Sequence, residues 1–144
     1  MRARVLSFLF VATIAAATSA YAADVTAKDA WFRDLPAGLP AGGYFTLHNG
    51  GKSPITLIGA ESSACGMLML HKSEDKGGMS AMIHMPSVAI PVDSDLKFAP
   101  GGDHLMCTNP TPALKAGAAV PVTLLFAGGA KLNASFTVRN ARGQ

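Results

Sequence analysis

Short stretches in which apolar and polar residues alternate are the feature that most restricts the fold of this chain. A period of two is typical of a strand with one buried face. The alternation is clearest in residues 120–126 and 132–138, and Gly128-Gly129 between them predicts a hairpin turn. Asn49-Gly50-Gly51 predicts a second turn. Further strand candidates are residues 44–48, 55–59, 67–71, 79–85, 88–91, 96–99 and 105–108.

No segment keeps helical spacing for three turns, so helices are not expected to build the core. About eight strands separated by frequent turns predict an all-β, single-domain fold. The expected architecture is an antiparallel Greek-key sandwich or barrel.

Residues 1–22 are predicted to be a secretory signal peptide. A positive start with Arg2 and Arg4 precedes an uncharged apolar run, and Ala20-Tyr21-Ala22 has the small residues of a cleavage site. The run is shorter than the roughly 20 apolar residues that a membrane-spanning helix needs. No cysteine follows it directly to carry a lipid. We therefore expect residues 23–144 to form a β-barrel domain in the periplasm, without a membrane anchor after cleavage.

Charge and motifs argue against two classes of function. The chain has a formal net charge of +3, which falls to +1 when Arg2 and Arg4 leave with the signal peptide. No Lys/Arg run remains to follow a phosphate backbone, so nucleic acid is not an expected partner. The sequence has no serine nucleophile elbow and no His-Glu-x-x-His motif. Glu74 and Asp75 are placed in a solvated polar loop, residues 72–78, so the chain is not expected to be an enzyme.

Histidine and methionine supply the candidate chemistry. The chain has four His and seven Met, and reduced copper prefers imidazole nitrogen and thioether sulfur to carboxylates. Because residues two apart in a strand share a face, the sequence predicts three groups of outward-facing donors, with Leu68 and Leu70 facing the core. His48 has no methionine nearby and is expected to have an ordinary structural role. The three groups are Met67, Met69 and His71; Met82 and His84; and His104 and Met106.

The spacing of four of these residues is specific. His71, Met82, His104 and Met106 form the pattern His-x10-Met-x21-His-x-Met. This pattern resembles that of the PCuAC family of periplasmic copper chaperones at all four positions. The likeness continues through Asp29-Ala30-Trp31, Ala41-Gly42-Gly43-Tyr44, Ile90-Pro91, Pro100-Gly101-Gly102 and residues 120–124.

The resemblance implies a cupredoxin-like barrel that binds one copper ion per chain, as Cu(I), through these two His and two Met. It also implies delivery of copper to the Cu(A) centre of cytochrome c oxidase, with the oxidase copper subunit and a Sco-type thiol protein as partners. Neutral, exchangeable ligands suit such a carrier.

The chain departs from the family pattern after the motif methionine. Ile83-His84-Met85 stands where relatives commonly have an Arg-Pro pair. His84 is therefore a candidate fifth ligand, or a ligand for Cu(II) as a secondary cargo. Met69, on the same predicted face as His71, is a second auxiliary candidate.

Cys65 and Cys107 are predicted to form a disulfide, because their number is even and the expected compartment is oxidising. A register that pairs His71 with His104 places Cys65 opposite residue 110, so the match is inexact. Gly66 and the Ser62-Ser63-Ala64 stretch are the candidates for the slack that the bridge needs. Cys107 follows Met106 and should point away from the metal. The alternative, a free Cys107 thiolate that binds copper, stays open at this point.

Three other functions compete with copper delivery. A blue-copper electron carrier needs a Cys thiolate beside two His, and Cys107 has the wrong strand parity for that role. A copper storage or resistance protein would bind the same ion and keep it. An interaction domain would contain its His and Met by coincidence.

Overall fold

The structure is a computed structural model that describes residues 24–144. The predicted signal peptide, residues 1–22, and the first residue of the predicted domain lie outside the described residues. Within that part no helix is long and apolar enough to cross a membrane. The fold is all-β, as predicted, with ten strands where about eight were expected. The strands are β1 (Val25–Arg33), β2 (Ala41–Asn49), β3 (Ile55–Glu61), β4 (Cys65–Lys76), β5 (Met79–His84), β6 (Val88–Ile90), β7 (Ser94–Phe98), β8 (Asp103–Pro110), β9 (Ala119–Phe126) and β10 (Lys131–Arg139), with short 3-10 turns at Pro36–Gly38 and Ala127–Gly129.

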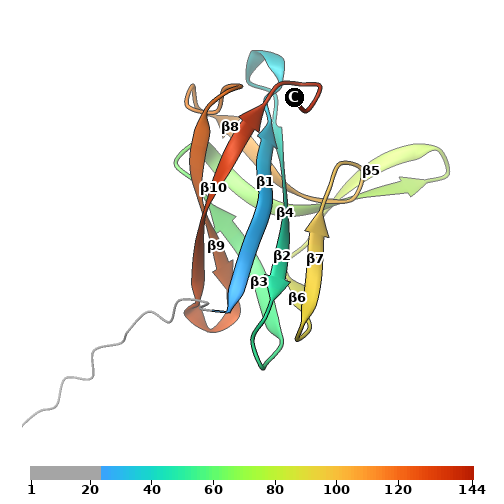
Figure 1. The fold of residues 1–144 in the computed structure, drawn as a ribbon. Helices are drawn as coiled ribbons and strands as arrows, with labels where there is room; N and C mark the ends of the chain where they lie inside the picture. The colour runs from blue at the N-terminus through green and yellow to red at the C-terminus, as the bar shows by residue number, and fades with distance from the viewer. Residues whose placement is uncertain (1–23) are drawn as a thin grey trace, which may run out of the picture.

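The strands follow the order β5-β4-β8-β2-β1-β10-β9-β3-β6, and β7 pairs with β2. Every pairing is antiparallel except that of β1 with β10, which is parallel. The first and last strands therefore lie side by side along the barrel (Figure 1). The prediction of a purely antiparallel arrangement was wrong for this pair. The architecture is cupredoxin-like.

The alternation of apolar residues positions the core as expected. All four apolar residues of β9 on one face are buried, and so are Phe136 and Val138 of β10. Leu68 and Leu70 of β4 are buried as well. These strands turn their apolar face inward because that face is the surface the fold removes from water. The predicted hairpin at Gly128-Gly129 joins β9 to β10, whose residues pair in antiparallel register.

The predicted turn at Asn49-Gly50-Gly51 is present, but the strands on its two sides do not pair with each other. β2 pairs with β1, β7 and β8, whereas β3 pairs with β6 and β9. The Asn49 side chain is fully buried and donates hydrogen bonds to the carbonyl oxygens of Ser53 (2.9 Å) and Ile90 (3.1 Å). This amide fixes the point at which the chain leaves β2.

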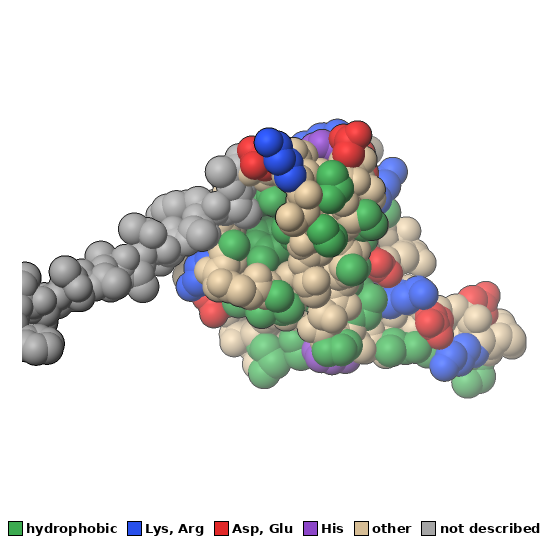
Figure 2. Space-filling model, turned by 90° about the horizontal axis from the view of Figure 1, so that it is seen from below, with side chains coloured by type: hydrophobic (Ala, Val, Ile, Leu, Met, Phe, Trp, Pro, Cys, Tyr) green, Lys and Arg blue, Asp and Glu red, His purple; other side chains and the backbone are tan. Residues whose placement is uncertain are grey.

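The prediction of a loop over residues 72–78 was wrong. β4 continues to Lys76, and only Gly77 and Gly78 form the turn to β5. Both glycines have positive φ, at 66° and 84°, as a two-residue type I′ hairpin turn requires. The hairpin projects from the barrel (Figure 1), and mixed acidic and basic side chains cover the projection (Figure 2). Its polar residues are solvated because they lie on a strand pair outside the core.

Candidate metal centre

Three imidazoles form a row across β5, β4 and β8. His71 in β4 lies opposite His84 in β5 and opposite His104 in β8. The ring centroids are 5.8 Å apart for His71 and His84 and 5.9 Å apart for His71 and His104. Residues directly opposite each other in adjacent strands share a face. The fold thus brings together three histidines that are far apart in sequence.

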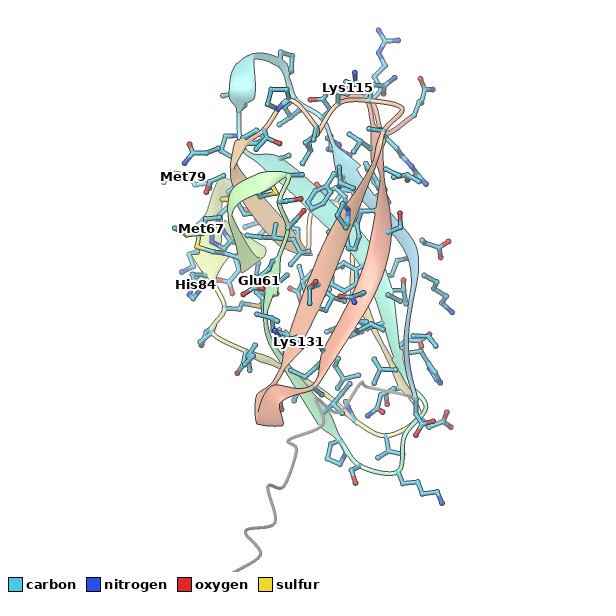
Figure 3. The ribbon with its side chains drawn as sticks, turned by 90° about the vertical axis from the view of Figure 1, so that its left-hand side faces the viewer. Glu61, Met67, Met79, His84, Lys115 and Lys131 are labelled. Atoms are coloured by element: carbon cyan, nitrogen blue, oxygen red, sulfur yellow. A yellow bond between two sulfur atoms is a disulfide. The ribbon has the colours of Figure 1, made fainter. Side chains whose placement is uncertain are left out.

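Thioethers flank this row on both sides. Met69 lies opposite Met106, one step along the face from His71 and His104, and Met82 lies opposite Ser73 on the other side of the row. Met82 is 60% exposed, whereas His104 is only 5% exposed. All four predicted ligands and both auxiliary candidates therefore lie on one face. Figure 3 shows Met67 and His84 on this flank of the molecule.

His104 is held in the orientation that a metal ligand needs. Its Nδ1 lies 3.0 Å from the carbonyl oxygen of Gly102. Because a carbonyl only accepts, Nδ1 carries the proton and Nε2 keeps a free lone pair. The backbone N–H of Ser73 donates to the same carbonyl (3.1 Å) and ties β4 to the turn before β8. Such a second bond on the far ring nitrogen is the usual way in which proteins orient a histidine ligand.

His71 also has a ring nitrogen that makes no hydrogen bond. Its Nδ1 is buried and has no hydrogen-bond partner, an arrangement that is costly unless something else binds there. Burial of the ring, followed by the nearby imidazoles of His104 and His84, lowers the pKa of His71 below its ordinary value of 6.5. The ring is therefore neutral at neutral pH, as coordination requires. The donor set of neutral nitrogen and thioether sulfur fits a soft cation.

A cleft of about 300 Å³ opens beside these donors. Met82, His104 and Met106 line it from the donor side, and Arg33 and Tyr44 line it from the opposite side. In the part of the chain that the structure describes, no three His, Cys, Asp or Glu side chains come together as a metal-binding group. The candidate centre is instead a mixed group of histidine and methionine.

The two cysteines form the predicted disulfide, Cys65–Cys107, with Cα atoms 5.4 Å apart. β4 and β8 have the anticipated register, with His71 opposite His104 and Cys65 opposite Pro110. Near the end of β8, Asn109 has a left-handed backbone conformation, with a φ of 49°. Cys107 is fully buried on the core face. Because both sulfurs are in the disulfide, neither is a thiolate, and within the described residues a blue-copper site has no cysteine ligand.

His48 and Glu74 were not predicted to bind the metal, and the structure gives each of them a different partner. His48 in β2 is hydrogen-bonded through Nδ1 to Asp95 in β7 at 2.8 Å. Glu74 forms ion pairs with Lys72 (3.6 Å) and Lys76 (3.8 Å) on the projecting hairpin. Both groups have structural partners of their own.

One part of the centre was not predicted. Arg33, which lines the cleft opposite the histidines, had no assigned role in the sequence. Trp31, Gly42 and Tyr44 belonged to the family resemblance, but no function was inferred for them. The Trp31-x-Arg33 spacing on an alternating segment was the available signal, because it places a cation and an indole on one face.

Fold and site together define a class of protein, a cupredoxin-like domain that presents a His/Met face. Residues 25–138 match the family model described as "LpqE-like: Putative lipoprotein LpqE-like". "Putative lipoprotein Lxx21020" of Leifsonia xyli subsp. xyli is 33% identical over 120 residues, which cover 83% of this chain and 72% of that protein. The chain therefore belongs to the LpqE-like family.

Solved structures agree with this assignment. The solution structure of CuI-DR1885 from Deinococcus radiodurans is 32% identical, with a TM-score of 0.62, and the match covers 76% of this chain and 74% of that one. The copper-bound PCuAC domain from PmoF2 has a TM-score of 0.67 at 21% identity, and the match covers 81% of this chain and 93% of that one. The second match shows the shared fold.

Proposed function

We propose that this chain is a periplasmic metallochaperone that binds one Cu(I) as cargo through His71, Met82, His104 and Met106. The observation that carries the proposal is the strand register. It places His71 opposite His104, and it puts the two methionines on the same face, on either side of this pair. Two imidazoles and two thioethers are neutral and soft, which favours Cu(I) over hard divalent cations.

The ligands differ in exposure and in their position in the sheet, which suits a carrier. His104 and Met106 lie on β8, between β4 and β2 in the sheet. Met82 lies on β5, which ends the sheet and pairs only with β4. The incoming ligand of a recipient can therefore reach the copper from the side of Met82, the most exposed of the four. Release begins there in the proposed mechanism, while His104 keeps its hydrogen bond to Gly102.

Two further donors extend the proposal. His84 lies opposite His71 at the exposed end of the imidazole row, and it is suited to join the site when the cargo is Cu(II), which accepts more nitrogen ligands. Met69, opposite Met106, is suited to replace a displaced thioether during exchange.

Anaerobic titration with Cu(I) against a competing chelator tests the binding step. Met82→Ala and His71→Ala should each weaken binding by more than about tenfold, or 1.4 kcal/mol. Met79→Ala is the matched thioether control, because Met79 is on the same hairpin, is 74% exposed and points to the opposite face. His48→Ala is the imidazole control. Equal losses in the variants and their controls would contradict the assigned site.

The delivery step is proposed from the family resemblance, with the Cu(A) centre of cytochrome c oxidase as recipient and a Sco-type protein as helper. Mixing the Cu(I)-loaded chain with the apo copper subunit, with and without the Sco-type protein, should move copper to that subunit. A loaded chain that keeps its copper through this assay supports storage or resistance instead. That result would leave the binding site intact and remove only the delivery role.

Export is the remaining part of the proposal. The lipoprotein-like family match agrees with an exported protein. If residues 1–22 are removed as a signal peptide, the intact mass of the periplasmic protein should correspond to a chain that begins at Ala23. A mass that includes the leader would contradict cleavage.

A further inference from the structure

The face that carries the copper ligands continues beyond β8 onto three more strands. Met106 lies opposite Gly42 in β2, and Gly42 lies opposite Arg33 in β1. One step along, Trp31 lies opposite Tyr44. These side chains therefore extend the same surface away from the thioethers, and Arg33 and Tyr44 line the same cleft as His104 and Met106.

Aromatic rings hold the guanidinium of Arg33 in place. Its Cζ lies 5.5 Å from the centroid of the Trp31 ring and 5.6 Å from that of Tyr44, and the two rings are 4.7 Å apart. Arg139 in β10, opposite Arg33, packs its own guanidinium 4.7 Å from the Trp31 centroid. Cation–π contacts of this length fix the cations without neutralising them.

Gly42 lets the aromatic rings that hold Arg33 approach the proposed copper ligands. A Cβ at position 42 would lie 2.5 Å from the Tyr44 Oη, closer than atoms can pack. The tyrosine ring therefore lies over a bare backbone, between Arg33 and the strand that carries Met106. This contact gives the Gly-Gly-Tyr sequence a role in shaping the cleft.

The charge of Arg33 lacks an anionic partner. Its Nε is buried and has no hydrogen-bond acceptor. Among residues 24–144, every ion pair uses a histidine or a lysine, and neither Arg33 nor Arg139 takes part in one. Leaving a buried donor unsatisfied costs about 1–3 kcal/mol, more for a charged group. An anion that enters the cleft would supply the charged partner that Arg33 lacks.

We propose that the cleft is an anion-binding subsite in which Arg33 takes a carboxylate group beside the copper ligands. The planar guanidinium matches the two oxygens of a carboxylate. A volume of about 300 Å³ accommodates a group of this size. Carboxylate oxygen is a hard donor, so it pairs with the guanidinium and does not displace the thioethers from Cu(I). The carboxylate is either a free small acid or an Asp or Glu side chain of a docking protein.

Copper and the anion should bind cooperatively. Cu(I) with four neutral ligands keeps a charge of +1, and three of its four proposed ligands line the same cleft as Arg33. An anion between the two cations reduces their repulsion, so each ligand should strengthen the binding of the other. This coupling rests on the proposed function, whereas the subsite itself does not.

Titration of the isotope-labelled apo protein with sodium acetate, followed by NMR, tests the subsite. Sodium perchlorate keeps the ionic strength constant. The Arg33 Nε–H resonance and the backbone amides of Gly42 and Tyr44 should shift and saturate together. Arg33→Gln should weaken acetate binding by about tenfold or more, because it removes charge-assisted hydrogen bonds. Arg33→Lys keeps the charge without the planar guanidinium, so its affinity for acetate should lie between those of the wild type and Arg33→Gln. Arg142→Gln is the matched control, since Arg142 is exposed and does not line the cleft.

Two further experiments identify the source of the carboxylate and measure its coupling to copper binding. A blocked Gly-Asp-Gly peptide that binds more tightly than its Gly-Asn-Gly counterpart indicates a protein side chain, whereas binding of acetate alone indicates a small free acid. In Cu(I)-loaded protein, acetate should bind about fivefold more tightly, at the lower end of typical coupling between sites.

A shift that grows linearly, and equally for Arg33 and Arg142, would overturn the subsite. If Arg33→Gln does not fold, the saturation of the wild-type Arg33 signal and the Arg33→Lys variant still decide the question. Saturation in apo protein without any copper binding would refute the proposed function and leave the subsite standing.

Discussion

Removal of the Cys65–Cys107 disulfide should destabilise the protein by an amount that follows from its place in the chain. The bridge joins β4 to β8, the two strands that carry His71, His104 and Met106. Replacing both cysteines by alanine removes the cross-link without leaving a thiol that would compete for copper. Cys107 is fully buried, and alanine adds no polar group to that position.

The magnitude comes from the loop that the bridge closes. A sequence separation of 42 residues corresponds to about 4 kcal/mol of lost unfolded-state entropy at room temperature in the chain-entropy model. Domains of this size have unfolding free energies of about 5–15 kcal/mol. The double variant should therefore fold, with a markedly lower urea midpoint. Backbone pairing still holds His71 opposite His104, so the folded variant should bind one Cu(I).

Urea unfolding of wild type and double variant, each as apo protein, measures the difference. Mass spectrometry after alkylation of the native, unreduced protein is the control. A change below about 1 kcal/mol would show that the bridge does not constrain the unfolded chain. Two alkylated thiols in the wild type would refute the bridge and return Cys107 to the list of candidate ligands.

Three further outcomes are expected. Because the pKa of His71 lies below 6.5, protons should compete with copper for this ring only as the pH falls through that lowered value. The stability of the apo protein, measured by urea unfolding, should begin to fall nearer 6.5, where the ring takes up its proton in the unfolded chain. A flat stability profile from pH 7 to 4 would contradict this linkage. Gly42→Ala should force Tyr44 aside, which should lower the free energy of unfolding by about 1–3 kcal/mol and shift the fluorescence of the single tryptophan. An unchanged emission spectrum and melting temperature would show that the contact is absent. Met69→Ala should weaken Cu(I) binding in the chelator titration by less than about tenfold, and by less than Met106→Ala does; the opposite order would make Met69 the principal thioether.

Strand parity explains why the face of the candidate centre was predictable. In an extended chain, residues two apart share a face whatever the neighbouring strands are. The outward position of Met69 and His71, with Leu68 and Leu70 in the core, therefore followed from local sequence alone. Bringing this strand to His104 required knowledge of which strands pair, and here the family spacing supplied what local pattern does not.

The errors in the predicted fold have a related cause. Residues 72–76 were assigned to a loop because they are polar, but a hairpin outside the core can be polar on both faces. Its regularity comes from pairing with β5 and from the two-glycine turn at Gly77-Gly78. The parallel pairing of β1 with β10 was missed because it joins the two ends of the domain. Contacts of that sequence separation leave no periodic signal in either strand.

Arg33 shows most clearly what local sequence does not contain. Its neighbours on the face are Gly42 across one strand boundary, Met106 across a second and Arg139 on the other side. Each pairing depends on the order β8-β2-β1-β10, so the cation, its aromatic support and the proposed copper ligands meet only in the folded protein. A basic residue in an alternating segment ordinarily indicates a solvated face. Here the same residue has a buried Nε and lines a cleft together with three of the proposed copper ligands. For that reason its proposed function depends on topology rather than on composition.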